Sequence, residues 1–157
     1  MRFLAAATTT ALLSVTALAA PTPCTPEGED STVYEIQDFT LRKYDGQNVA
    51  TLSFNILATN GGTLDFECSP YDPVTNTATQ AFESDNVYSC GKNSLFSFSY
   101  DVSSTELFLW QEITTDNTIG GSIKTGDPIC RAGGSSASDL VCTVPDIVKL
   151  DVTLTKL

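Results

Sequence analysis

Apolar and polar residues alternate in several short runs of this 157-residue chain, and turn-forming residues separate the runs. Residues 51–56 are apolar at every second position, and the same alternation returns in residues 63–68. Asn60-Gly61, between the two runs, tolerates the positive φ that a tight hairpin turn needs. Because successive side chains of a strand point to opposite faces of a sheet, this pattern predicts a β-hairpin with one apolar face.

Two other stretches predict a second hairpin. Residues 95–100 carry aromatic side chains at alternate positions, and residues 106–113 predict the partner strand across the polar turn 101–105. Residues 148–155 alternate without a fault, which predicts a strand near the C-terminus.

The first predicted strand, residues 33–43, contains a change of phase. Its apolar positions shift from Tyr34 and Ile36 to Phe39 and Leu41. One extra residue moves every later side chain of a strand to the other face. We therefore expect a β-bulge between Ile36 and Phe39.

No stretch after the first twenty residues shows sustained helical periodicity, and the polar, Pro-containing residues 69–86 predict the longest loop. Many short strands leave unpaired edges unless their sheet closes on itself or packs on a second sheet. We therefore predict an all-β fold, as a closed or nearly closed antiparallel barrel, with a sandwich as the alternative.

The first twenty residues resemble a secretory signal peptide, with a positive charge, an apolar stretch and the small residues Ala17 and Ala19. A membrane anchor is the alternative, but Pro21 follows an apolar stretch at the short limit for a span. Cleavage after Ala19 predicts a protein that is secreted. The expected parts are a signal peptide at 1–19, a Pro- and acid-rich arm at 20–31 and one domain at 32–157.

The charge is acidic, with nineteen Asp and Glu against eight Lys and Arg and a net charge of −11. Nucleic-acid-binding domains are basic, so the charge argues against nucleic acid as a partner. Anionic membranes are disfavoured for the same reason, whereas a basic protein partner would be attracted. The simpler interpretation of the acidic charge is that it keeps a secreted protein soluble.

Five cysteines in an exported chain indicate two disulfides and one cysteine left over. Proximity along the chain favours a disulfide between Cys68 and Cys90 and another between Cys130 and Cys142, although the sequence alone leaves other pairings open. Each disulfide would stabilise the folded state by about 3 kcal/mol, because it reduces the entropy of the unfolded chain. Cys24 then remains on the arm, as a free thiol or as a bridge to a second copy. An oxidising compartment favours the bridge.

Three motifs and the spacing of all five cysteines carry a resemblance to a known family. The motifs are NILATNGGTLDFECS at 55–69, VYSCGKNS at 87–94 and CRAGG at 130–134. They closely resemble the signature of the Alternaria major allergen family of fungal secreted proteins. The resemblance extends from Cys24 to near the C-terminus and departs in the 69–86 loop and around residues 116–128.

The resemblance implies a compact antiparallel β-barrel of about eleven strands with two intrachain disulfides. It pairs Cys68 with Cys90 and Cys130 with Cys142, and it matches Cys24 to the cysteine that links two subunits, although some relatives are monomers. Family members are secreted or associated with the cell wall, and they are known as allergens and as elicitors of plant defence, without a settled enzymatic activity. They are also reported to bind thaumatin-like plant defence proteins and small flavonoids, at sites that the motifs do not place.

Two pairs of carboxylates are candidate catalytic groups. Asp65 and Glu67 share the outer face of one predicted strand, and paired carboxylates are what a glycosidase requires. Because such groups need burial to shift their pKa values, we interpret this pair as a solvated acidic face. Glu106 and Glu112 are interpreted in the same way.

The chain contains no histidine, which removes Ser-His and Cys-His nucleophile systems and His-ligated metal sites. Asp72, Glu83 and Asp85 lack the regular spacing of a calcium loop. We therefore predict no catalytic residue, no metal and no cofactor.

Phe108 and Trp110 alternate with Leu107, Leu109 and Ile113 along one predicted strand. If the aliphatic face is the core, the two aromatic rings form an exposed platform for a sugar ring, a flavonoid or a protein partner. The alternative is a strand that is buried on both faces or covered by a second subunit.

The leading hypothesis is a secreted, non-enzymatic fungal effector that engages plant surface or defence proteins and triggers immune responses. The alternative is a β-barrel that binds a small ligand such as a flavonoid, or a carbohydrate. A hydrolase is a third, weaker hypothesis.

Overall fold

The structure is a computed structural model that describes residues 32–59, 64–79, 81–145 and 150–156. The predicted signal peptide and the arm with Cys24 lie outside the described residues. Within those residues the chain forms eleven strands. In chain order they are β1 (Thr32–Lys43), β2 (Thr51–Ala58), β3 (Asp65–Cys68), β4 (Pro70–Tyr71), β5 (Tyr88–Cys90), β6 (Phe96–Asp101), β7 (Glu106–Thr114), β8 (Asn117–Lys124), β9 (Ile129–Ala132), β10 (Leu140–Thr143) and β11 (Leu150–Lys156).

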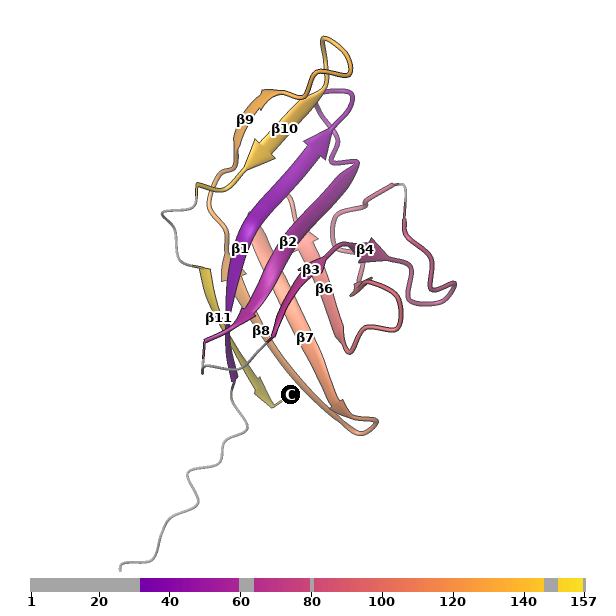
Figure 1. Ribbon diagram of the computed structural model, residues 1–157, viewed down its shortest axis with the longest axis vertical. Coiled ribbons are helices and arrows are strands. Elements are labelled where there is room, and N and C mark those ends of the chain that lie inside the picture. The colour runs from indigo at the N-terminus through magenta and orange to yellow at the C-terminus, as the bar shows by residue number, and fades with distance from the viewer. Residues whose placement is uncertain (1–31, 60–63, 80, 146–149, 157) are drawn as a thin grey trace, which may run out of the picture.

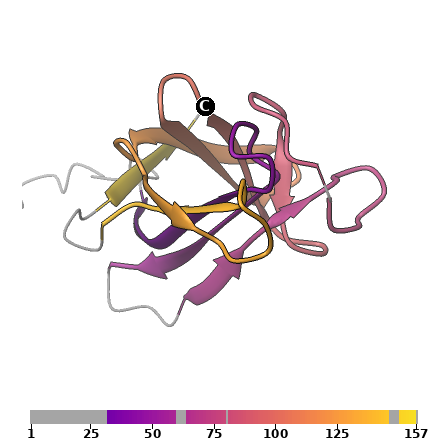
Figure 2. The same ribbon diagram turned by 90° about the horizontal axis from the view of Figure 1, so that it is seen from above.

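The strands pair antiparallel in the order β3-β2-β1-β11-β8-β7-β6-β5-β4 (Figure 1). β1 is long enough to pair with β11 through its first half and with β10 through its second half. β9 pairs with β10 and forms a hairpin at one end of the molecule. Seen along the long axis, the strands curl around a central core, which makes a nearly closed barrel (Figure 2).

The two ends of this strand order, β3 and β4, are neighbours in the sequence. Cys68 ends β3 and Pro70 begins β4, so that Ser69 alone separates them. The disulfide between Cys68 and Cys90 joins β3 to β5, and Cys90 pairs with Pro70 across the sheet. The chain and the disulfide together therefore close the seam of the barrel, and this disulfide is confirmed.

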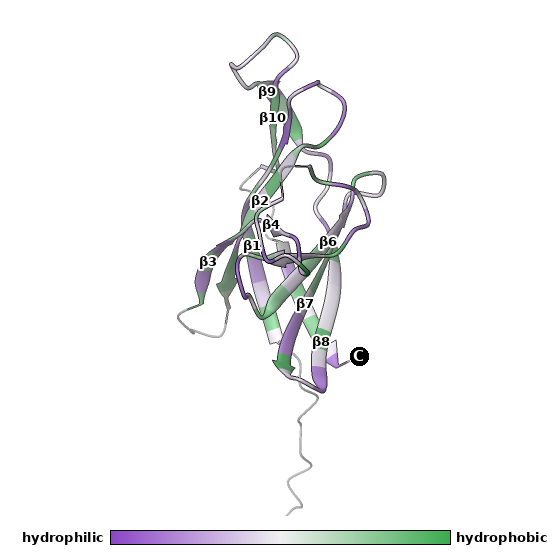
Figure 3. Ribbon diagram, turned by 90° about the vertical axis from the view of Figure 1, so that its right-hand side faces the viewer, coloured by the Kyte–Doolittle hydropathy of each residue, from purple (hydrophilic) through white to green (hydrophobic). Residues whose placement is uncertain are grey.

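Hydrophobic and hydrophilic residues alternate along the strands (Figure 3). The inward side chains form one core that is rich in aromatic rings. Phe54 contacts Phe39 and Phe98, with ring centroids 5.9 Å and 5.2 Å apart. The largest fully buried side chains are Tyr100, Phe39, Phe54, Phe98, Ile36, Leu52, Ile56, Leu107, Leu109, Ile119, Leu154 and Val152.

Both predicted hairpins are confirmed. In the first, Phe54 lies opposite Cys68 and Ile56 opposite Phe66, although the turn at residues 60–63 is outside the described residues. In the second, Phe98 lies opposite Leu109. The local alternation of side chains was sufficient to define both pairings.

The predicted bulge in β1 is also confirmed. The register against β2 shifts between Gln37 and Thr40, and Asp38 adopts φ +52°. A positive φ is uncommon outside glycine but is tolerated by Asp. The bulge turns Phe39 back toward the core, where its side chain is 1% exposed.

One side chain was placed on the wrong face. The sequence pattern put Ile113 with Leu107 and Leu109 in the core, but its side chain is 48% exposed. The register between β7 and β8 shifts between Glu112 and Thr114, so the alternation of β7 breaks before Ile113 is reached. A continuous apolar alternation in the sequence cannot reveal such a shift.

The short strands β4, β9 and β10 and the longer β8 were not predicted. β8 contains Gly120 and Gly121, which interrupt the apolar alternation. A side chain at Gly121 would collide with the backbone of Thr153 in the neighbouring β11. Gly121, which interrupts the apolar alternation of β8, is therefore also the residue that allows β8 to approach β11 closely.

The β9–β10 hairpin is held by a disulfide and an ion pair. Cys130 and Cys142 face each other across the hairpin and are bonded, as predicted. Asp139, whose side chain is fully buried, accepts hydrogen bonds from the Arg42 guanidinium at 2.9 and 3.1 Å and from the Ser135 amide at 3.0 Å. We call Arg42, Ser135 and Asp139 the hairpin clamp.

Candidate functional site

The structure leaves the predicted carboxylate pairs in solvent-facing positions. Asp65 and Glu67 are both exposed on the outer face of β3. Glu106 and Glu112 lie on the outer face of β7, and Glu106 accepts a hydrogen bond from the Ser122 hydroxyl at 2.8 Å. None of these carboxylates is buried, and the structure therefore shows no enclosed pair of the kind that a glycosidase uses.

The interior of the barrel is filled by the aromatic core. Phe39, Phe54 and Phe98 are each at most 1% exposed, and their rings are in contact. Near the other end of β1, the Tyr34 hydroxyl reaches across the interior and donates a hydrogen bond to Gln111 at 2.6 Å. Close packing of these rings favours recognition on the outer surface of the described part of the chain.

The first candidate surface is an aromatic strip, which we define as Phe108 and Trp110 on the outer face of β7. Their ring planes lie within 13° of parallel, with centroids 6.1 Å apart. Both side chains are half-buried, whereas Leu107 and Leu109 on the inner face are fully buried. The aliphatic face of β7 is therefore the core face, and the two rings lie on the outer face, where they are half-buried and not fully exposed. Their role in binding stays a prediction.

Small residues flank the aromatic strip on both sides. Trp110 lies opposite Ser97 of β6 and opposite Gly120 of β8. Phe108 lies opposite Ser99 and Ser122 in the same two strands. Neither neighbouring strand therefore has a side chain at these positions that could cover the rings.

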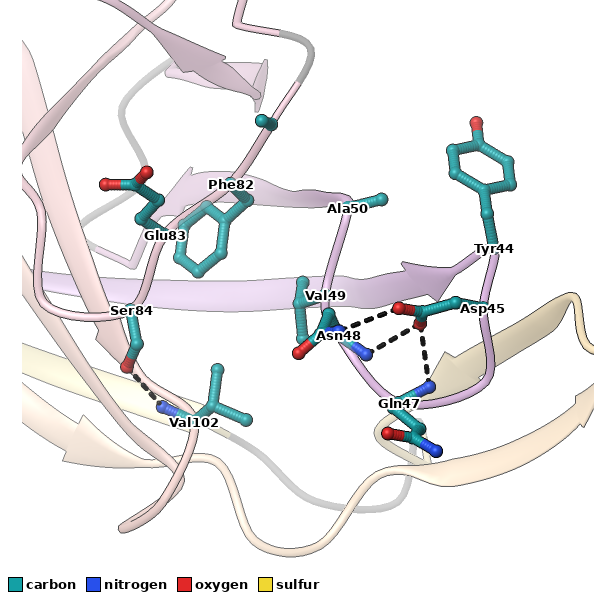
Figure 4. Close-up of a pocket in the computed structure, with 11 residues that line it drawn as sticks. Tyr44, Asp45, Gln47, Asn48, Val49, Ala50, Phe82, Glu83, Ser84 and Val102 are labelled. Carbon is teal, nitrogen blue, oxygen red and sulfur yellow. Dashed lines mark hydrogen bonds between the residues drawn. The ribbon is translucent and has the colours of Figure 1, made fainter.

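The second candidate surface is an open groove of about 690 Å³ at one end of the barrel, which we call the end groove. The β1–β2 turn, residues 81–84 and the β6–β7 turn form its walls. Val49, Phe82 and Val102 point into the space between these loops, and Asp45 and Glu83 lie on opposite sides of it (Figure 4). Its volume lies within the range of small-ligand sites.

The carboxylate on one side of the end groove is held rigidly. Asp45 accepts hydrogen bonds from the Gln47 and Asn48 amides at 2.8 and 2.7 Å, and from the Asn48 side chain at 2.7 Å. These donors, the Gln47 amide first, lower the pKa of Asp45 below its ordinary value. Asp45 therefore keeps its negative charge in mildly acidic surroundings.

Sequence reasoning did not find the end groove, because its walls come from segments that are distant along the chain. One signal was present, since Phe82 is one of only two aromatic residues, with Tyr71, within the polar stretch 69–86. In the structure Phe82 is 7% exposed and contacts Tyr88 with ring centroids 5.2 Å apart. An aromatic residue in a polar loop indicates that the loop packs on the core at that point.

Neither a metal site nor a membrane helix is found in the described part of the chain. No three or more His, Cys, Asp or Glu residues there form a group that could hold a metal ion. The same residues include no helix with the length and apolarity needed to cross a membrane.

Comparisons with known proteins give one consistent result. The family model of Alternaria alternata allergen 1 matches residues 36–142. The chain is 41% identical to the major allergen Alt a 1 of Alternaria alternata, over 85% of this chain and 80% of that protein. It is 39% identical to the allergen Ulo b 1 of Alternaria botrytis, over 76% and 81% of the two chains.

The structural comparison agrees with the sequence comparison. A crystal structure of Alt a 1 superposes with a TM-score of 0.69 at 38% identity, and the match covers 88% of this chain and 97% of that chain. The shared barrel, the three motifs and the family-model match together show that this chain belongs to the Alternaria alternata allergen 1 family.

Proposed function

We propose that the protein is a secreted, non-enzymatic effector that engages plant surface or defence proteins and triggers plant immune responses. Its relatives are named as allergens, which describes proteins that are recognised and does not describe a reaction. The observation that carries the proposal is the filled core together with the loop-built end groove. A packed barrel leaves its outer surface for recognition, and loops on a rigid scaffold are where binding residues concentrate.

Thaumatin-like plant defence proteins are the partner class that we propose for the end groove. Tyr44, at the rim, is 50% exposed, and aromatic residues of this kind anchor protein interfaces. Asp45 and Glu83 supply negative charge, and the whole chain carries −11. A partner with a basic patch would therefore associate rapidly, at a rate that falls as salt is added.

Infiltration of leaves tests the immune response. The purified mature protein is expected to elicit a local defence response, whereas a heat-denatured sample is not. The absence of a response from the native protein across several host plants would contradict the proposal.

A binding measurement with a purified basic thaumatin-like protein tests the surface. Tyr44→Ala and Glu83→Gln are expected to weaken binding, because both residues line the end groove. Glu67→Gln, an exposed carboxylate change on β3, is the matched control and should leave binding unchanged. Equal binding by all four proteins would show that the partner uses a different surface.

A further inference from the structure

The aromatic strip is not used by the proposed function, and its surroundings point to a specific class of ligand. We propose that the strip binds a neutral β-linked oligosaccharide, with sugar rings lying against Trp110 and Phe108. This inference stands independently of the immune response and of the end groove.

The shape of the surface follows from the register of the strands. The residues that pair across the sheet at the level of Trp110 form a row over six strands. Only two side chains in this row, Tyr71 and Trp110, are aromatic, and the others are small. The row is Tyr71 of β4, Ser89 of β5, Ser97 of β6, Trp110 of β7, Gly120 of β8 and Thr155 of β11. The aromatic rings of the strip therefore stand above the small residues on either side of them. We call these small residues of the neighbouring strands, among them Ser97 and Gly120, the shoulders.

The burial of the shoulders indicates how the rings lie. Ser99 faces outward opposite Phe108, yet it is only 6% exposed. Gly120, opposite Trp110, is also buried. Because the neighbouring residues are small, the aromatic rings are the side chains available to cover them. Rings that rest on the sheet in this way present apolar area outward.

The chemistry of the shoulders matches a sugar better than a purely aromatic ligand. A β-linked pyranose has C–H groups on its faces, which pack on aromatic rings, and hydroxyl groups around its rim. Ser97 lies opposite Trp110, and Ser89 and Thr155 lie one strand further out on either side. Their hydroxyl groups can each donate and accept a hydrogen bond along the path of an extended ligand. Among the described residues, the Ser97 hydroxyl has no hydrogen-bond partner and is free to bind a ligand.

The charge distribution selects a neutral sugar. The rows at Phe108 and Trp110 contain no charged residue, whereas Glu106, paired with Lys124, and Glu112 lie beyond the two rings. The net charge of −11 repels an acidic polysaccharide such as polygalacturonate. Neutral glucans and chitin oligomers share the remaining chemistry, so the experiment must tell them apart.

Trp110 is the sole tryptophan, and its fluorescence therefore reports directly on the strip. The full mature protein is titrated with hexamers of β-1,4-glucose, β-1,3-glucose and β-1,4-N-acetylglucosamine, and with polygalacturonate. At least one neutral hexamer should give a saturable blue shift of the emission, and polygalacturonate should give none. The hexamer that binds identifies the source of the sugar.

Isothermal titration with variants locates the site. Trp110→Ala should weaken binding of that hexamer by about ten-fold or more, and Phe108→Ala by less. Trp110→Phe should restore part of the affinity, which a merely structural defect would not do. Tyr44→Ala removes a half-exposed aromatic residue at the end groove and should leave sugar binding unchanged.

Three results would overturn the proposal. One is the absence of binding by every neutral hexamer at millimolar concentration. Another is quenching of Trp110 by a flavonoid such as quercetin in the absence of any response to the sugars. The third is a blue shift that depends on protein concentration without sugar, because a second copy or a protein partner would then occupy the strip.

Discussion

The barrel and the β9–β10 hairpin are stabilised by different means. Phe54, in the barrel, is surrounded by other rings and is 1% exposed. All four residues of β9 are exposed, and Ile129 among them is 64% exposed. The hairpin depends instead on a disulfide and on the hairpin clamp. The barrel should therefore respond to losses of apolar volume, and the hairpin to reductant and acid.

The largest effect is expected from the core. Phe54→Ala removes a ring that contacts two others, and it should lower the free energy of unfolding by about 3–5 kcal/mol. Ile129→Ala, the matched change in the hairpin, should cost less than about 1 kcal/mol because its side chain is largely in solvent. Urea unfolding measures both values. Similar losses for the two variants would contradict the distinction between barrel and hairpin.

Removing each disulfide separately gives the next largest effect. Replacement of both Cys68 and Cys90 by Ala opens the seam of the barrel and should cost about 3 kcal/mol or more, because both are buried. Replacement of Cys130 and Cys142 should cost less globally and mainly speed hydrogen exchange in β9 and β10. A larger global loss from the hairpin pair would show that the hairpin and the barrel unfold as one unit.

The hairpin clamp predicts a response to pH. Hydrogen bonds from Arg42, and then from the Ser135 amide, hold the pKa of Asp139 well below its ordinary value of 3.8. A lowered pKa means that the clamp contributes its full stability well above pH 3.8 and loses it as the pH falls below that value. Protection of the β9 and β10 amides, measured against the intrinsic exchange rate at each pH, should therefore fall in acid.

Asp139→Asn sharpens this test. At neutral pH it should speed exchange in the hairpin, and the difference from the wild type should shrink in strong acid. Asp101→Asn is the control, because Asp101 also has a lowered pKa, of about 2, but is the last residue of β6 and lies outside the hairpin. A pH-independent effect of Asp139→Asn would show that the charge of the clamp is not what holds the hairpin.

The smallest effect on stability is expected at Cys24, which lies outside the described residues. We predict that it links two copies, so that non-reducing electrophoresis shows a dimer that reductant converts to monomer. Cys24→Ser should abolish that dimer and leave the melting temperature nearly unchanged, because the Pro-rich arm has little that can pack on the barrel. If the wild-type mature protein runs only as a monomer, the prediction is wrong.

The sequence predicted those parts of the fold that depend on local alternation. The β2–β3 and β6–β7 hairpins and the bulge before Phe39 all follow from side-chain period, whereas the same period left the orientation of Trp110 open. Proximity along the chain and the resemblance to a family gave the two disulfide pairings.

Other features depend on contacts between distant segments. Gly121 conceals β8 because its small size is needed against β11, a contact that no local pattern shows. The partners of the hairpin clamp, Arg42 and Asp139, are 97 residues apart. The end groove likewise joins turns that are distant in the sequence. Packing in three dimensions decides these features, and local period carries no information about it.

The place of β11 in the sheet determines when the barrel can form. This last strand lies between β1, the first strand, and β8, and Thr32 pairs with Leu154. Contacts between the two ends of a chain form slowly because a long loop must close first. The residues up to β11 must therefore have left the ribosome before the barrel can close. Until then the growing chain exposes its aromatic core residues, and a chaperone that retains it until synthesis is complete would protect it from aggregation.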